Sequence, residues 1–169
     1  MKIIRLYVTA LLVIALVPAA AFAGKVVLPE ETEVKVKFDP SIMVNSGMLQ
    51  KGLNLPIILA EDITIGGKTI VEKGAEGAAK VIEIESASRP GDPGYIKIAF
   101  TGINARGEYS TATGDMIKLT GELESRGKSR KVLSWIFILG LFISGKEGEI
   151  DTSQVYTAEV AETVILQTG

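Results

Sequence analysis

The sequence predicts a mainly β protein: a small antiparallel β-barrel or sandwich with one apolar insertion, a short helix or hairpin, before the last strands. Three observations lead to this prediction. Segments in which apolar and polar residues alternate with period two recur along the chain. Turn sequences rich in Gly separate them, with 18 Gly in 169 residues. After residue 23, no segment shows the period of about 3.6 residues that marks an amphipathic helix.

The chain begins with the features of a secretory signal peptide. Lys2 and Arg5 form a basic start, Leu6–Val17 is almost wholly apolar, and Ala21-Phe22-Ala23 supplies the small residues that signal peptidase reads. We therefore expect residues 1–23 to be removed. The alternative is a retained membrane anchor, but the apolar stretch is well short of the roughly 20 residues that cross a bilayer.

Removal of that segment leaves residues 24–169, which we predict to be a single β-barrel domain with an apolar insert at 132–144. The protein is expected to be exported, and to be periplasmic or associated with the outer membrane. An exported protein is free to form disulfides, yet this chain has no Cys, so its stability must come from a packed core.

Alternation and turn residues define the expected strands. In the first, Val34, Val36 and Phe38 alternate with charged residues, as in a strand with one buried face. Gly66-Gly67 indicates a two-residue hairpin turn, and Pro56 indicates an edge strand or a bulge. The expected strands are 32–38, 53–60, 63–65, 68–71, 78–86, 95–103, 116–123 and 155–166.

Composition removes most enzyme chemistry. Without His or Cys there is no Ser–His pair, no thiol nucleophile, and no imidazole or thiolate ligand for a metal, haem or iron–sulfur cluster. The remaining candidates are carboxylates: Glu61, Asp62, Glu83, Glu85, Asp115, Glu122 and Glu124. Glu83 and Glu85 share one strand face, which we interpret as a solvated face. We predict no enzymatic activity and no cofactor. The formal charge of −2 gives no reason to expect nucleic acid.

One segment does not suit a plain soluble barrel. Residues 132–143 are apolar on every face at either period, and cations precede and follow them. Three interpretations stay open: a buried strand or core helix, a membrane-contacting helix or hairpin tip, and a protein docking surface. The candidate membrane or partner contacts are Trp135, Ile136, Phe137, Ile138, Leu139, Leu141, Phe142 and Ile143. The candidate headgroup contacts are Arg126, Lys128, Arg130 and Lys131.

The order of turns and strands resembles the C-terminal β-barrel domain of the TrbI family of conjugal-transfer proteins, the outer-membrane-core subunit of type IV secretion systems. The segments that carry the resemblance are Leu28–Val34, Leu59–Ile63, Val71–Gly74, Asn104–Gly107 and Ile150–Val155. The family's turn pattern is Ile-Pro-x-Gly-Thr. In this chain the first turn lacks the Gly, the second lacks the Pro, and the third lacks both.

The resemblance implies a barrel fold and export. It also implies that residues 132–143 stand where the family inserts an apolar helical antenna that reaches the outer membrane, although this insert is about half as long. The family's proline-rich linker and inner-membrane helix have no counterpart in the sequence. A role in DNA transfer is therefore not inferred, and we expect a small stand-alone relative.

Two functions follow as hypotheses. The first is a non-catalytic, exported, envelope-associated structural or interaction module that contacts the outer membrane or a partner subunit through residues 132–143. Its expected partners are membrane lipid or an envelope protein, and self-association into a homo-oligomer stays open. The alternative is a periplasmic β-barrel that binds a small ligand in its mouth. A transmembrane β-barrel is disfavoured, because the strands are short and aromatic residues make up only 6% of the chain.

Overall fold

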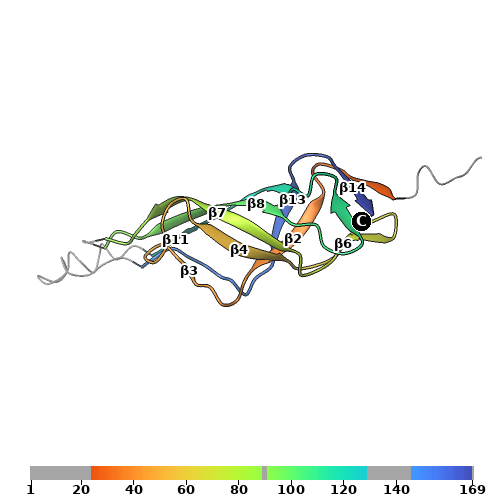
Figure 1. Ribbon diagram of the computed structural model, residues 1–169. Helices are drawn as coiled ribbons and strands as arrows, with labels where there is room; N and C mark the ends of the chain where they lie inside the picture. Colours follow the sequence, from red (N-terminus) through yellow and green to blue (C-terminus); the bar gives the residue numbers. More distant parts are fainter. Residues whose placement is uncertain (1–23, 89–90, 129–145, 169) are drawn as a thin grey trace, which may run out of the picture.

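The computed structural model describes residues 24–88, 91–128 and 146–168, and these residues form β-strands and no helix (Figure 1). The strands are β1 (Lys25–Leu28), β2 (Glu33–Phe38), β3 (Val44–Asn45), β4 (Asn54–Leu59), β5 (Ile63–Ile65), β6 (Lys68–Val71), β7 (Glu76–Glu85), β8 (Tyr95–Ile103), β9 (Tyr109–Thr111), β10 (Ile117–Thr120), β11 (Glu122–Arg126), β12 (Glu149–Ile150), β13 (Tyr156–Val160) and β14 (Val164–Thr168).

Six of these strands close into an antiparallel barrel. Their order around the ring is β10, β13, β2, β4, β7 and β8, and β8 pairs with β10 again to complete it. Closure leaves the ring without an open sheet edge, and therefore without a long row of unpaired backbone groups. The mainly β prediction is confirmed, and of its two architectures the structure forms the barrel.

Gly121 separates β10, the strand that closes the ring, from β11. β10 and β11 follow one another along β8, and Gly121 stands between them with φ +132°. The Gly121 carbonyl accepts a hydrogen bond from the Phe100 amide at 3.0 Å. Beyond Lys118, β10 leaves β8 and pairs with β13. The prediction of one strand over 116–123 is wrong for this reason.

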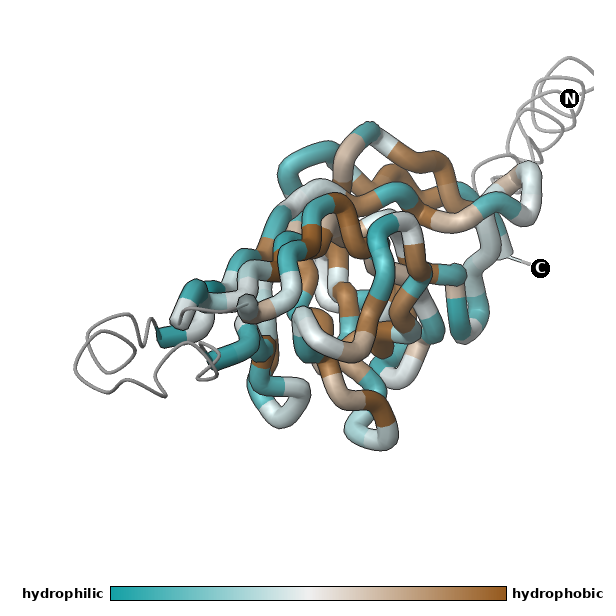
Figure 2. The backbone as a smooth tube through the Cα atoms, turned by 90° about the vertical axis from the view of Figure 1, so that its left-hand side faces the viewer, coloured by the Kyte–Doolittle hydropathy of each residue, from teal (hydrophilic) through white to brown (hydrophobic). Residues whose placement is uncertain are grey.

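Apolar side chains from all six strands fill the interior. Phe38 lies at its centre, with its ring 6.5 Å from that of Phe100 and 5.9 Å from that of Tyr156, the latter in an edge-to-face arrangement. Aromatic pairs favour such geometry over face-to-face stacking. Figure 2 shows hydrophobic and hydrophilic positions alternating along the strands, as expected for a layer with one buried face.

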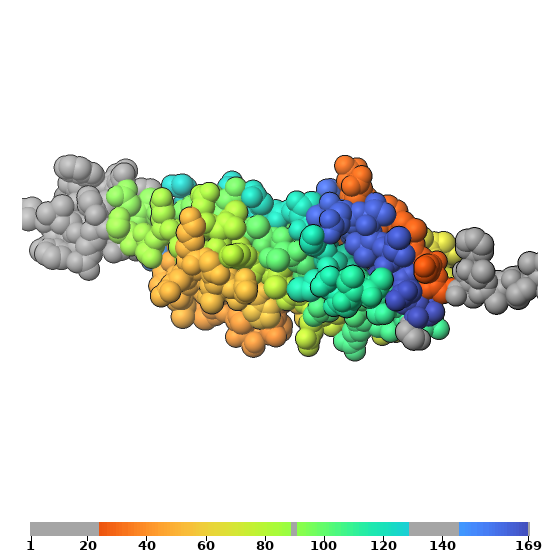
Figure 3. All heavy atoms as spheres, turned by 45° about the horizontal axis from the view of Figure 1, so that its top comes forward, coloured from red at the N-terminus to blue at the C-terminus, as the bar shows by residue number. Residues whose placement is uncertain are grey.

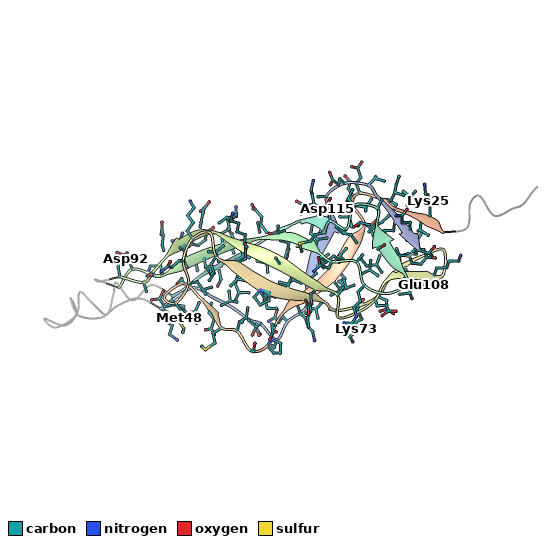
Figure 4. All side chains as sticks on the ribbon, viewed as in Figure 1. Lys25, Met48, Lys73, Asp92, Glu108 and Asp115 are labelled. Atoms are coloured by element: carbon teal, nitrogen blue, oxygen red, sulfur yellow. The ribbon has the colours of Figure 1, made fainter. Side chains whose placement is uncertain are left out.

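The molecule is elongated because structure is added at both ends of the ring. At one end, β1, β14 and β9 form a small sheet beside the β5–β6 hairpin. At the other end, β7 and β8 extend past the ring and pair with each other and with β11. The segment around residues 40–52, orange in Figure 3, lies against this extension. Lys25 and Asp92 mark the two ends (Figure 4).

Most predicted strands are confirmed to within a residue or two, but the short strands β1, β3, β9 and β12 were not predicted. The predicted strand 155–166 is wrong, because residues 161–163 separate β13 from β14. The prediction of an edge strand or bulge at Pro56 is also wrong: β4 lies between β2 and β7, and Pro56 sits where the β2 ladder ends, so its missing N–H costs no ladder bond. Register shifts occur instead in the pairing of β7 with β8, between Ala78 and Ala79 and between Val81 and Glu83.

The polar turns after Leu28 and Val71 each contain a residue with positive φ, three positions after the leading apolar residue. In the turn after Leu28, Glu31 has φ +61°, and in the turn after Val71, Gly74 has φ +82°. Both leading residues are fully buried. The third turn, after Ile150, is built differently: the Asp151 carboxylate accepts hydrogen bonds from the Ser153 amide and hydroxyl. Glu31 is the one non-Gly residue with positive φ among the described residues.

We expect Glu31→Gly to raise the free energy of unfolding by about 0.5–1 kcal/mol, because it removes the side-chain strain of a left-handed backbone. Thermal unfolding followed by circular dichroism measures the change. The matched control is Glu30→Gly, an adjacent exposed residue with the same charge and without positive φ. This control should leave stability unchanged or lower it, and an equal gain from both variants would contradict the explanation.

Candidate functional site

The two chain segments that lead into and out of residues 129–145 are hydrogen-bonded to each other at one end of the barrel. The Lys146 amide donates to the Lys128 carbonyl at 3.0 Å. The Gly94 amide donates to the Lys146 carbonyl at 2.9 Å, and the Gly127 amide donates to the Gly94 carbonyl at 2.9 Å. We call these four residues, Gly94, Gly127, Lys128 and Lys146, the neck.

Glycines make the close approach at the neck feasible. A Cβ on Gly127 would overlap the Lys146 carbonyl oxygen, and a Cβ on Gly94 would collide with the Ser46 hydroxyl. Neither position therefore tolerates a side chain without movement of backbone or of a bonded group. The close backbone contacts of the neck therefore require glycine at positions 94 and 127.

Glu147 fastens the neck to the barrel. Its carboxylate accepts hydrogen bonds from the Ser46 hydroxyl at 2.5 Å and from the Ala87 amide at 2.9 Å. Ser46 is fully buried, and its hydroxyl also accepts a hydrogen bond from the Gly148 amide at 2.9 Å. Three connections that are distant in sequence, at residues 46, 87 and 147, therefore meet in one polar cluster at the end of the β7–β8–β11 extension.

Most of the predicted contact residues lie outside the described residues: Trp135, Ile136, Phe137, Ile138, Leu139, Leu141, Phe142, Ile143, Arg130 and Lys131. The structure does place Arg126 and Lys128. Both are exposed, Arg126 at the end of β11 and Lys128 in the neck. The Arg126 guanidinium stacks over the Tyr95 ring, 4.9 Å from its centroid. Two of the four predicted headgroup contacts therefore lie at the base of the apolar segment, and exposed Lys146 joins them.

The outward side of the extension carries several candidate carboxylates. Across β7, β8 and β11, Glu83 is in register with Lys97 and Glu124, and Glu85 is in register with Tyr95 and Arg126. We call this the glutamate face: Glu83, Glu85, Glu122 and Glu124.

Lys97 and Tyr95 on β8 both interact with glutamates of the glutamate face. Lys97 forms an ion pair of 2.7 Å with Glu122, and this hydrogen bond raises the pKa of Lys97. Desolvation, followed by the hydrogen bond to Glu124, raises the pKa of Tyr95. The arrangement is that of a solvated, cross-paired sheet face, as the sequence predicted.

The remaining candidate carboxylates do not converge on a common point. Asp62 accepts a hydrogen bond from the Lys73 amide at 2.6 Å in the turn after β6, and Asp115 lies beside β10. Among the described residues there is no group of three or more acidic side chains placed to hold a metal ion.

Open hollows lie on the surface of the described structure. One of about 570 Å³ is lined by Lys68, Glu72, Glu108 and Tyr109 at the end that carries β1. A second of about 540 Å³ adjoins β10 and β14, and a third of about 400 Å³ adjoins β3 and β12. None of them is the interior of the ring, which side chains such as Phe38 and Phe100 fill.

The comparisons with known proteins do not identify a family for this chain. We compared the chain with models of protein families, with curated proteins and with solved structures, and none of these comparisons gave a match. Within residues 24–88, 91–128 and 146–168, the structure contains no helix of the length and hydropathy needed to span a bilayer. The resemblance to the TrbI family stays a hypothesis based on its sequence motifs.

Sequence reasoning missed the residues that build the neck. Glu147 and Ser46 lie in ordinary polar stretches, and nothing local marks them as partners across a separation of 101 residues. The signal that could have indicated the junction is the set of glycines near the apolar segment, because Gly94, Gly127 and Gly148 each permit a close backbone approach.

We expect Glu147→Ala to lower the free energy of unfolding by about 1–3 kcal/mol, because it leaves the Ser46 hydroxyl and the Ala87 amide without their acceptor. Urea denaturation followed by circular dichroism measures this. The control is Glu149→Ala, an exposed glutamate two residues away, which should change stability by less than about 0.5 kcal/mol. Equal effects of the two variants would show that the polar cluster does not hold the neck.

Proposed function

We propose that this protein is a non-catalytic, exported, envelope-associated module whose barrel presents residues 132–143 to a membrane. The observation that carries the proposal is the neck. Lys128 and Lys146, the last described residues on either side of the apolar segment, are hydrogen-bonded to each other at one extreme end of an elongated barrel. A segment tethered in this way leaves and re-enters the domain at one point.

The described residues form a hydrophobic core within the ring. The ring and its buried side chains belong to the described residues, and the interior contains the Phe38 cluster. Burying the eight large apolar side chains of residues 135–143, at roughly 1.5–3 kcal/mol each, is worth on the order of 12–24 kcal/mol. A free-energy term of this size favours a partner that covers them, and we assign that role to lipid.

The flanking charges select lipid over a protein partner. Arg126, Lys128 and Lys146 are exposed around the neck, and Arg130 and Lys131 are adjacent in sequence. Cations beside an apolar segment that also contains Trp135 are the composition of a membrane-interface element: the rings favour the headgroup level and the cations favour anionic lipid.

The proposed export is compatible with the position of the N-terminal end. β1 begins at Lys25, one residue after the expected new N-terminus, so cleavage before Gly24 would leave its pairing with β14 intact. Lys25 and Asp92, which is two residues before Gly94 of the neck, lie at opposite ends of the molecule (Figure 4). Loss of residues 1–23 would therefore not disturb the surface that we assign to the membrane.

The ligand-binding alternative has less support. A barrel that binds a ligand inside needs an interior cavity, but here Phe38, Phe100 and their neighbours occupy the ring. The hollows described above are open, and the one beside Lys68 and Glu108 is lined mainly by charged and polar groups. We therefore keep membrane attachment as the proposed function.

We expect the double variant Trp135→Ser/Phe137→Ser to reduce partitioning onto vesicles of phosphatidylethanolamine and phosphatidylglycerol by at least about tenfold, because two large apolar contacts are lost. Vesicle flotation measures it. The control is Val27→Ser/Ile165→Ser, which removes an exposed apolar pair, 52% and 55% exposed, from the opposite end. This control should bind as the unchanged protein does.

Two outcomes would contradict the proposal. One is a folded, monomeric protein that fails to float with any vesicle. The other is a double variant that still floats but unfolds at a much lower temperature in the absence of lipid, which would show that the segment packs into the barrel. Mass spectrometry of the purified protein establishes whether residues 1–23 are present, because that segment would bind lipid by itself.

A further inference from the structure

We propose that residues 46–52, which lie next to the neck, form the surface of the barrel that faces the membrane. In this orientation Met48 enters the anionic headgroup region beside Lys128 and Lys146. We call residues 46–52 the neck loop. The inference rests on the proposed function and adds to it the orientation of the barrel on an anionic phospholipid surface.

The neck loop is fixed to the neck by backbone pairing. β3 pairs with β12, and the pairing continues one step further toward the neck: the Ser46 amide donates to the Gly148 carbonyl at 2.9 Å. The chain then turns, and the Gly52 amide donates to the Val81 carbonyl of β7 at 2.8 Å. The neck loop is therefore the point at which this part of the chain comes nearest to the neck.

The turn holds one apolar side chain outward. The Asn45 carbonyl accepts hydrogen bonds from the amides of Met48 and Leu49, at 3.2 and 3.3 Å. Leu49 packs against the core, whereas Met48 is 68% exposed. Figure 4 shows Met48 on the same half of the molecule as Asp92, away from Lys25 and Glu108. A flexible, polarisable thioether is suited to an irregular, changing surface such as a lipid interface.

Charge distinguishes the two sides of the extension. The glutamate face covers the outward side of β7, β8 and β11, and its four glutamates outnumber the three cations beside them: Lys80, in the same row as Glu122, Lys97, paired with Glu122, and Arg126, over the Tyr95 ring. This side is therefore less favourable for an anionic surface than the neck end, where Arg126 lies. On the neck-loop side, Lys51, Lys128 and Lys146 are exposed, and the carboxylate of Glu147 is held by Ser46 and Ala87. Glu147 and exposed Glu149 are the two opposing carboxylates on this side, against three lysines.

The composition of the chain allows a site-specific test. It has no Cys and a single Trp, so one introduced cysteine and the native Trp135 report on separate places. Full-length proteins carrying Met48→Cys, Glu85→Cys on the glutamate face, or Glu108→Cys at the far end are labelled with an environment-sensitive fluorophore. They are then mixed with vesicles of phosphatidylethanolamine and phosphatidylglycerol, or of phosphatidylcholine alone.

We expect the probe at position 48 to shift to the blue and brighten with the anionic vesicles, and to lose that change at high salt, because screening weakens the attraction of surface cations. Probes at positions 85 and 108 should not change. In unlabelled protein, Met48→Ser should weaken vesicle partitioning about threefold to tenfold. Met43→Ser, a change at another exposed methionine (63% exposed) further from the neck, should not weaken it.

The outcomes separate this inference from the proposed function. If Trp135 emission shifts to the blue with vesicles while the probe at position 48 does not, the orientation is wrong and membrane attachment stands. A response at position 85 equal to that at 48 also overturns the orientation. If neither Trp135 nor position 48 responds, both proposals fail. A probe at 48 that is already shielded without vesicles, and becomes exposed in Trp135→Ser/Phe137→Ser, would show that the protein's own apolar segment covers Met48.

Discussion

The hydrogen bond between the Lys146 amide and the Lys128 carbonyl is the constraint on which the functional account depends. It brings the two ends of residues 129–145 together, and the Gly94 and Glu147 contacts fasten that point to the barrel. Because backbone groups and a buried hydroxyl carry these contacts, the geometry depends little on the mobile ends of surface side chains. The position of the apolar segment on the molecule is therefore set by the fold itself.

The barrel provides a rigid support for this junction. Antiparallel pairing around the ring leaves no open edge, and the Phe38 cluster fills the interior. The extension of β7, β8 and β11 continues toward the neck, and its two sides differ: one carries the glutamate face, while residues 40–52, orange in Figure 3, lie against the extension. One domain thus presents a closed core, an acidic side and a basic end.

Sequence patterns predicted the fold where burial repeats with period two, and failed where a single residue interrupts the ladder. Strands such as β2 and β8 alternate cleanly, and Gly66 and Gly67 both adopt the positive φ of the predicted hairpin. The break at Gly121 and the register shift after Val81 depend on pairing with distant strands, so local patterns do not reveal them. The neck has the same origin: Ser46 and Glu147 become partners only when the barrel brings them together. The choice of Arg126 and Lys128 as candidate headgroup contacts was possible from the sequence, because cations beside an apolar segment are visible locally.

Depth-dependent quenching of Trp135 tests the central claim most directly. It is the only Trp in the chain and lies within the apolar segment. With vesicles that contain lipids brominated at a shallow or a deep position on the acyl chain, we expect Trp135 emission to be quenched, most strongly by the shallow bromines, because indole rings favour the interface. Unquenched emission from a protein that is folded and exposed to the same anionic vesicles would contradict the assignment of this segment to the membrane.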